Sequence, residues 1–199
     1  MSERFEIHQL RPFTRDEIWS IIDDGYETNE IYVVEKSESD AHTIFDIHLV
    51  QLAVPYQNNF YEDFSQEEID YYNRLLQRGF SFGAYHGERL IGVALAEAFL
   101  DDRLLRVWEI HVLAAFRRQG VGRALMERVV TKAQQAQIGM IKLETQNTNV
   151  KAIRFYRSMG FTLDSIDMSE YFNSDEAGSK QIAFYMKRRL TDDELPGGI

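Results

Sequence analysis

The sequence contains no cysteine, and proline occurs only three times in its 199 residues. Without cysteine, a disulfide scaffold and a cysteine zinc cluster are both excluded. No stretch approaches the roughly 20 consecutive apolar residues that a membrane-spanning helix needs. The N-terminus lacks the basic start and apolar core of a secretory signal. These absences lead us to expect a soluble, cytoplasmic protein.

Positive charge is scarce as well. The chain has 32 acidic and 22 basic residues, which gives a formal net charge of -10. This is the wrong sign for a protein that binds nucleic acid by neutralising phosphates, so we expect neither a nucleic-acid nor a membrane partner. A cationic small molecule or a basic peptide suits this charge better. Histidines lack the i, i+4 spacing of a metal site, so we expect no metal; they are His8, His42, His48, His86 and His111.

Hydrophobic patterning predicts a mixture of helices and strands. Two S/T-x-x-E sequences, at residues 14–17 and 65–68, predict helices that end before Gly25 and Gly79. Alternating and β-branched residues predict one hairpin from strands 31–34 and 44–50, and another from strands 81–86 and 89–98. Further along we expect strands at 104–112, 141–145, 161–171 and 181–188, with helices at 120–137 and 150–159. The order indicates an α/β or α+β domain with a mixed sheet.

One strand-to-helix loop has the composition of an anion site. Residues 117–123 read Arg-Arg-Gln-Gly-Val-Gly-Arg, and the free N–H groups of the following helix point into them. Glycines at 120 and 122 leave room for a phosphate, although a tight turn also needs them. A dinucleotide fingerprint is excluded because its third glycine falls at Leu125, and a triphosphate loop is excluded because no Gly-Lys-Ser/Thr follows.

The residues around this loop resemble the GNAT acetyltransferase superfamily. Ile110-His-Val112 precedes Arg117-x-x-Gly120-x-Gly122, and the second half of the signature is matched by Asn149, Ala152, Tyr156, Gly160 and Phe161. The resemblance implies a mostly antiparallel sheet of six to seven strands with about four helices. It also implies a cleft for acetyl-CoA, the acetyl donor, where the strands ending at Val112 and Thr145 splay apart.

The resemblance also implies donor-binding residues. The backbone of Ile110, His111 and Val112 would bind the pantetheine arm, and Asn149 would be a further pantetheine contact or a simple helix cap. The pyrophosphate would lie against the loop made by Arg117, Arg118, Gln119, Gly120, Val121, Gly122 and Arg123.

The catalytic residues implied are a tyrosine acid and a carboxylate base. Tyr156 resembles the family's acid, which protonates the departing thiolate. Positions that hold the base in several members are occupied by Arg106 and Trp108, neither of which can serve. Glu144, twelve residues before Tyr156, resembles the glutamate of ribosomal-protein N-terminal acetyltransferases. Glu109 is the reserve base, with His111; both have the opposite strand parity from Arg106 unless a β-bulge re-aims them.

A nearer resemblance is to streptothricin acetyltransferases. It rests on the run 143–147 and on scattered matches that include Phe155, Ser165, Asp167, Tyr171, Asn173, Lys180 and Tyr185. We therefore expect residues 1–190 to form a single N-acetyltransferase domain, with 1–64 a variable N-terminal part and 191–199 a flexible acidic tail. The expected acceptor is a primary amine of a small molecule, with a streptothricin-like or aminoglycoside-like antibiotic as one candidate.

Other interpretations stay open. A protein or peptide N-acetyltransferase is the enzyme alternative, and a non-catalytic acyl-CoA-binding domain is an alternative of a different class. A homodimer is also open. Acidic residues that could seat a cationic substrate, or could simply be solvated surface charges, are Glu97, Asp101, Asp164, Asp167, Glu170, Asp175 and Glu176.

Overall fold

The computed structural model describes residues 5–22, 25–58, 65–171 and 181–191. Within them, one sheet has the strand order β1-β4-β5-β6-β7-β9-β8, and a second sheet pairs β2 with β3. The strands of the first sheet are β1 (Glu6–Gln9), β4 (Phe82–His86), β5 (Arg89–Phe99), β6 (Leu104–Val112), β7 (Met140–Gln146), β8 (Thr162–Asp167) and β9 (Ala183–Arg189). The helices are α1 (Arg15–Ile22), α2 (Gln66–Leu76), α3 (Val121–Gln135) and α4 (Val150–Ser158). This confirms the predicted mixed sheet of six to seven strands with about four helices.

The chain divides into two compact units. The first comprises residues 1–24, 60–143 and 187–199, and the second comprises residues 25–59 and 144–186. In the first unit β1, β4, β5 and β6 pair antiparallel in that order, and β6 pairs with β7 in parallel. The parallel register runs from Leu104 with Met140 to Val107 with Leu143, whereas β6 continues to Val112.

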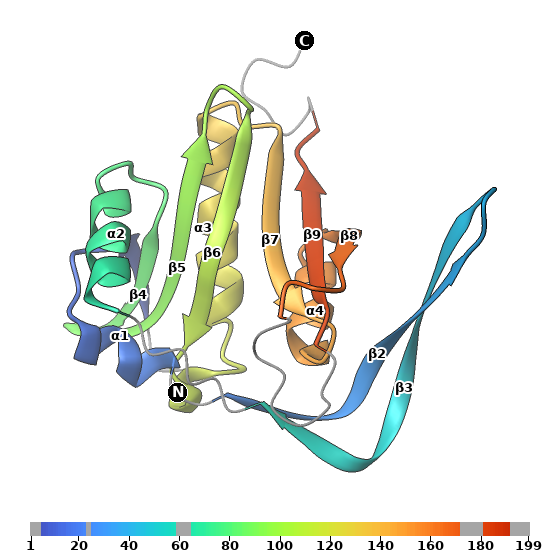
Figure 1. Ribbon diagram of the computed structural model, residues 1–199. Helices are drawn as coiled ribbons and strands as arrows, with labels where there is room; N and C mark the ends of the chain where they lie inside the picture. Colours follow the sequence, from blue (N-terminus) through green and yellow to red (C-terminus); the bar gives the residue numbers. More distant parts are fainter. Residues whose placement is uncertain (1–4, 23–24, 59–64, 172–180, 192–199) are drawn as a thin grey trace. The chain divides into compact units, whose positions relative to one another are not determined.

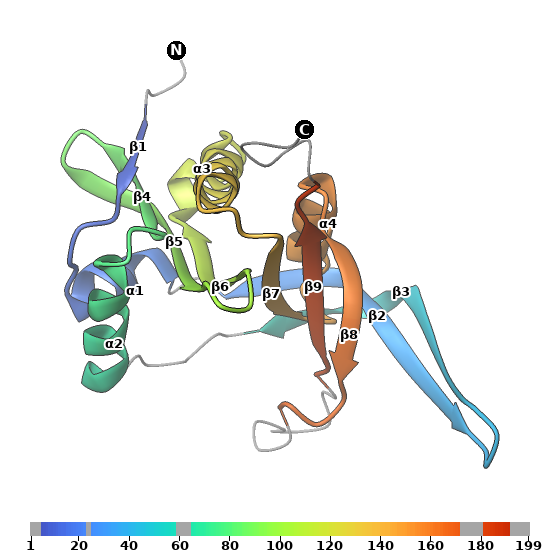
Figure 2. The same ribbon diagram turned by 90° about the horizontal axis from the view of Figure 1, so that it is seen from above.

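Helices cover both faces of the sheet in the first unit. Helix α3 lies on one face, and α1 and α2 lie on the other (Figures 1 and 2). A Cβ at Gly92 would lie 3.3 Å from Val121 and Leu125, so a small residue lets α3 approach β5 closely. On the opposite face Leu95 belongs to the core cluster with residues of α1 and α2, such as Ile18 and Tyr72.

A β-bulge in β6 sets the direction of its side chains. Leu95 of β5 pairs with Glu109, but its neighbour Ala96 pairs with Val107, so Trp108 is the extra residue. Glu97 pairs with Arg106 and lies two residues from Leu95, on the same face of β5. Glu109 therefore faces the same side as Arg106, toward α2. The expected opposite parity was wrong, and the alternative of a re-aiming bulge is confirmed.

The second unit is built on a long hairpin. Strands β2 (Tyr26–Glu38) and β3 (Thr43–Asn58) pair antiparallel from Tyr26 with Asn58 to Glu38 with Thr43, and form the extended ribbon in Figure 1. Helix α4 holds the start of this ribbon through side chains spaced three apart. Lys151 donates to the Glu27 carbonyl at 2.9 Å, Arg154 pairs with Glu30 at 2.7 Å, and Arg157 donates to the Tyr32 hydroxyl at 2.6 Å.

Asn147 joins three parts of the second unit. Its side chain donates to the Tyr32 carbonyl at 2.8 Å and accepts from the Ile182 N–H at 2.9 Å. Its own N–H donates to the Ile182 carbonyl, and its carbonyl accepts from the Tyr32 N–H. The residue is only 3% exposed, so these bonds satisfy a buried amide between β2 and β9.

Several predicted boundaries were inaccurate. Strand β8 ends at Asp167, four residues earlier than expected, because the Asp167 carboxylate accepts from the N–H and hydroxyl of Ser169 and turns the chain. The first hairpin is longer than its apolar runs, and the four-residue edge strand β1 was not predicted. Residues 192–199 of the predicted acidic tail lie outside the described part. No described helix is long and apolar enough to cross a membrane.

Candidate acetyltransferase site

The loop before α3 is shaped by its backbone. The 3-10 turn Ala114–Phe116 follows β6, and Arg117 Nε donates back to the Val112 carbonyl at 2.9 Å. Arg118 and Gly120 both have positive φ, of 64° and 90°. A positive φ is costly for arginine, and such strain concentrates at functional sites. When residues with left-handed backbone alternate with other residues just before a helix, the successive backbone N–H groups point toward one side of the loop.

The start of α3 fits an anionic group. Its N-cap is Gly120, which makes no side-chain cap hydrogen bond, whereas α2 begins with a complete capping box between Ser65 and Glu68. A Cβ added at Gly120 would meet no heavy atom within 4 Å, so the space in front of the helix is open. The first N–H groups and the positive end of the helix dipole therefore face room that a phosphate group can fill.

The predicted site residues at the end of β6 lie on both faces of the sheet. Ile110 and Val112 pair with Ala94 and Gly92, on the α3 face. His111 lies on the α2 face, where its Nε2 is 2.8 Å from Glu109 Oε2. Tyr72 of α2 donates to the other Glu109 oxygen at 3.4 Å. Glu109 and His111 thus form a half-buried pair beneath α2.

A second carboxylate on this face is fully buried. Glu97 is 6% exposed and accepts from Arg78 at 2.7 Å, from Tyr71 at 2.8 Å and from the indole of Trp108 at 3.2 Å. Burial, and then the neighbouring Glu97, raises the pKa of the Tyr71 hydroxyl. The expectation that Glu97 is a solvated surface charge was wrong. Its bonds hold the bulged Trp108 against α2.

The second unit places Tyr156 and Asn149 on α4. Tyr156 is 8% exposed, and its ring lies 5.4 Å from that of Phe155 and 6.1 Å from that of Phe161. Asn149 caps the helix, because its side chain accepts from the Ala152 N–H at 3.2 Å. The interpretation of Asn149 as a helix cap is confirmed.

Glu144 lies in a polar cluster of the same unit. The Tyr171 hydroxyl donates to Glu144 Oε1 and accepts from Gln146 Nε2 at 3.0 Å. Glu144 and Gln146 are two residues apart on β7, so they share one face of the strand. Sequence reasoning gave Tyr171 no role, because a contact across 27 positions leaves no periodic signal.

Tyr26 adds a second phenol near this cluster. Its hydroxyl lies 2.6 Å from Thr148 Oγ1 and accepts from Asn58 at 3.0 Å. The pKa of Tyr26 is raised to about 12, chiefly by burial; the hydrogen bonds with Asn58 and Thr148 lower it, and the nearby Tyr56 and Glu144 raise it by smaller amounts. Tyr26 therefore stays protonated throughout the neutral range.

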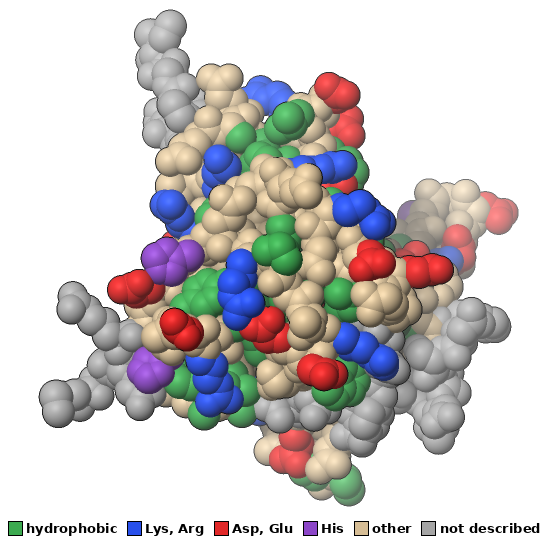
Figure 3. All heavy atoms as spheres, turned by 90° about the vertical axis from the view of Figure 1, so that its left-hand side faces the viewer, with side chains coloured by type: hydrophobic (Ala, Val, Ile, Leu, Met, Phe, Trp, Pro, Cys, Tyr) green, Lys and Arg blue, Asp and Glu red, His purple; other side chains and the backbone are tan. Residues whose placement is uncertain are grey.

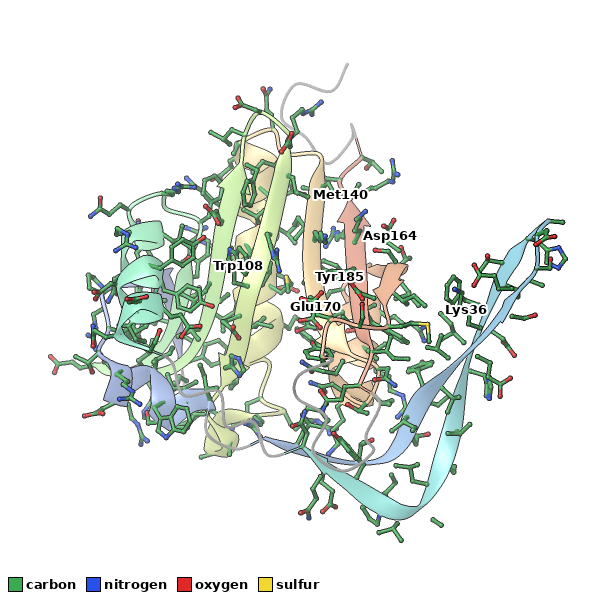
Figure 4. The ribbon with its side chains drawn as sticks, in the orientation of Figure 1. Lys36, Trp108, Met140, Asp164, Glu170 and Tyr185 are labelled. Atoms are coloured by element: carbon green, nitrogen blue, oxygen red, sulfur yellow. The ribbon has the colours of Figure 1, made fainter. Side chains whose placement is uncertain are left out.

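Another acidic candidate, Glu170, has a local partner. Glu170 accepts from the Tyr185 hydroxyl at 2.9 Å, and both are labelled in Figure 4. Asp175 and Glu176 lie outside the described residues. Acidic and basic side chains are interspersed on the face in Figure 3, with no continuous basic patch on its described part. Among the described residues, no group of three or more His, Asp or Glu side chains could hold a metal ion.

The chain matches a known family of acyltransferases. The Acetyltransferase (GNAT) family matches residues 42–161, and the chain belongs to it. The protein is an N-acetyltransferase of this family.

Three similar proteins indicate which acetyltransferases this chain resembles. Streptothricin acetyltransferase of Escherichia coli is 28% identical over an alignment of 165 positions that covers 77% of this chain and 88% of that protein. The solved structure of nourseothricin acetyltransferase is 26% identical, has a TM-score of 0.71 and covers 94% of this chain and 99% of its own. The [ribosomal protein bS18]-alanine N-acetyltransferase of Escherichia coli (strain K12) is 28% identical over 99 residues, 50% of this chain and 66% of that protein.

Proposed function

We propose that the protein transfers acetyl from acetyl-CoA directly to a primary amine of a small molecule of the streptothricin class. The observation that carries this proposal is the extent of the likeness to nourseothricin acetyltransferase. That match covers 94% of the chain. The unmatched residues are too few to include the whole hairpin Tyr26–Asn58, so the match extends into the hairpin. The likeness to the ribosomal-protein acetyltransferase covers half of the chain. Similarity that includes the hairpin favours the antibiotic acceptor over a peptide.

The loop before α3 is proposed to bind the pyrophosphate of acetyl-CoA. Support comes from the open space at Gly120 and from the uncapped first turn of α3. Arg118 and Arg123 bring positive charge to the loop, and Arg117 braces it against Val112. The backbone of Ile110, His111 and Val112 lies beyond the parallel register with β7, where the pantetheine arm can pair with it. Gln119, Val121 and Gly122 complete the proposed pyrophosphate loop of the first unit, and Asn149, the N-cap of α4 in the second unit, is proposed as a pantetheine contact.

Two side chains of the second unit are proposed to move the protons. Acetyl-CoA supplies an acetyl thioester that a neutral amine can attack. A substrate ammonium must first lose a proton, which Glu144 takes directly or through one water, and Tyr156 protonates the departing thiolate. A buried phenol suits the second role because tyrosine is fully protonated at neutral pH.

Glu109 is the second candidate for the base. The bulge at Trp108 turns it to the α2 face, and its carboxylate lies 2.8 Å from the His111 ring nitrogen. Glu109→Gln therefore tests the alternative to Glu144.

Two measurements test these assignments. First, kcat/KM is compared for streptothricin, an aminoglycoside and a peptide with N-terminal alanine, and streptothricin should lead by at least about tenfold. A preference for the peptide would establish the peptide N-acetyltransferase instead. Second, Glu144→Gln should lower kcat/KM most at neutral pH and less at alkaline pH, where more amine is neutral. A normal profile beside an impaired Glu109→Gln profile would move the role to Glu109.

Three broader proposals accompany the reaction. Residues 1–190 act as one N-acetyltransferase domain, with the variable part at 1–64, and the family match at 42–161 draws on both compact units. The net charge of -10 favours a cationic acceptor over nucleic acid or a membrane surface. The proposed location of the reaction is the cytoplasm. Association into a homodimer is tested by sedimentation of the purified chain.

A further inference from the structure

We propose that Tyr171 is a positioning residue for acetyl transfer, acting through the carboxylate of Glu144. This inference rests on the proposed role of Glu144 as the base. Tyr171 follows β8 in the chain, whereas Glu144 lies on β7, so the contact joins two separate elements of the second unit.

The direction of the bonds fixes which group donates. The Gln146 amide nitrogen is a donor only, and it points at the Tyr171 oxygen at 3.0 Å. The single hydroxyl proton of Tyr171 is then directed to Glu144 Oε1, to which the hydroxyl donates. Gln146 is 6% exposed, so the amide that orients the phenol is itself held in the interior.

This arrangement has two effects on Glu144. A hydrogen bond to one carboxylate oxygen selects a side-chain rotamer, and so fixes where the carboxylate points. A donor also favours the charged form of a carboxylate, which keeps it able to accept a proton at lower pH. The first effect places the base for proton transfer, and the second keeps it ionised at the cost of some basicity, so the proposed contribution of Tyr171 is mainly positioning.

The test is Tyr171→Phe, which removes the hydroxyl and keeps the ring. Tyr185→Phe is the matched control, because it removes a hydroxyl that donates to the exposed Glu170 in the same unit. We expect Tyr171→Phe to lower kcat/KM by about 10- to 100-fold at neutral pH, the range for a hydrogen bond to a charged group. The acid limb of its pH profile should move to higher pH. Acetyl-CoA affinity should stay within about twofold, and Tyr185→Phe should match the wild type.

A double variant separates positioning from a structural role. Adding Tyr171→Phe to Glu144→Gln should cause no further loss, because the hydroxyl acts only through the carboxylate. Losses that add in full, or a Tyr171→Phe enzyme with a wild-type profile, would overturn the inference while leaving Glu144 as the base. A Glu144→Gln enzyme with a wild-type profile would overturn the base assignment, and this inference with it.

Discussion

Replacing Gly120 by alanine separates the donor-binding role of the α3 loop from its folding role. Gly120 has a φ of 90°, and an added Cβ would meet no protein atom within 4 Å. The cost to folding is therefore the left-handed backbone alone, about 1–2 kcal/mol. For a chain of this length, such a loss lowers the melting temperature by about 2–8 °C.

The effect on acetyl-CoA binding should be larger. The new methyl group would lie in front of the first N–H groups of α3, where a pyrophosphate oxygen is proposed to bind. A hydrogen bond to a charged group contributes about 1.5–3 kcal/mol, so loss of one bond raises the dissociation constant of CoA at least about tenfold. Isothermal titration of CoA into the folded variant measures this change.

Gly87→Ala is the matched control. Gly87 also has a positive φ, of 60°, and its added Cβ also meets nothing within 4 Å, but it lies in the turn between β4 and β5. It should lose a similar amount of stability and bind CoA normally. Wild-type affinity in Gly120→Ala, or an equal loss of affinity in both variants, would refute the assignment of the loop.

Three further predictions concern residues outside this loop. Tyr156→Phe should lower kcat about 100-fold and leave CoA affinity within about twofold, and an unchanged kcat with chemistry rate-limiting would end the acid role. Asn147→Ala should lower the free energy of unfolding by about 2–5 kcal/mol, because it removes two buried hydrogen bonds. The exposed Asn29→Ala should cost under about 0.5 kcal/mol, and equal losses would show that the Asn147 bonds contribute little. Because the pKa of Tyr26 is about 12 when folded and 10 when unfolded, the unfolded chain loses its proton first, and stability should fall between pH 10 and 12. This fall should be about 2 kcal/mol smaller in Tyr26→Phe, and identical falls would contradict the assigned burial.

The elements that were predicted well from the sequence depend on features that act over a few neighbouring residues. Strand β6 matches its expected bounds, and α2 begins at the expected capping box, because apolar content and a Ser-x-x-Glu cap act over a few residues. The hairpin was underestimated because the outer parts of β2 and β3 are held by their pairing with each other rather than by apolar runs. Strand β8 was overestimated because Asp167 turns the chain in a sequence that still has strand character.

The candidate site was predictable only where a motif marks it. The signature at residues 117–122 identified the α3 loop, since its residues are contiguous in the chain. The bulge at Trp108 and the bond from Tyr171 to Glu144 depend on strand register and on distant pairing, which single-residue patterns do not carry. Glu97 shows the same limit, because its burial is produced by Arg78, Tyr71 and Trp108.

Direct acetyl transfer from acetyl-CoA to a small-molecule amine is the step on which all the proposed residue roles depend. It is tested by measuring free CoA thiol and acetylated streptothricin in the same reaction, with and without the amine. We expect equal amounts of both products, formed only when enzyme, donor and amine are all present. Tight binding of acetyl-CoA with no amine-dependent thiol release, for streptothricin or for any other primary amine, would contradict direct transfer.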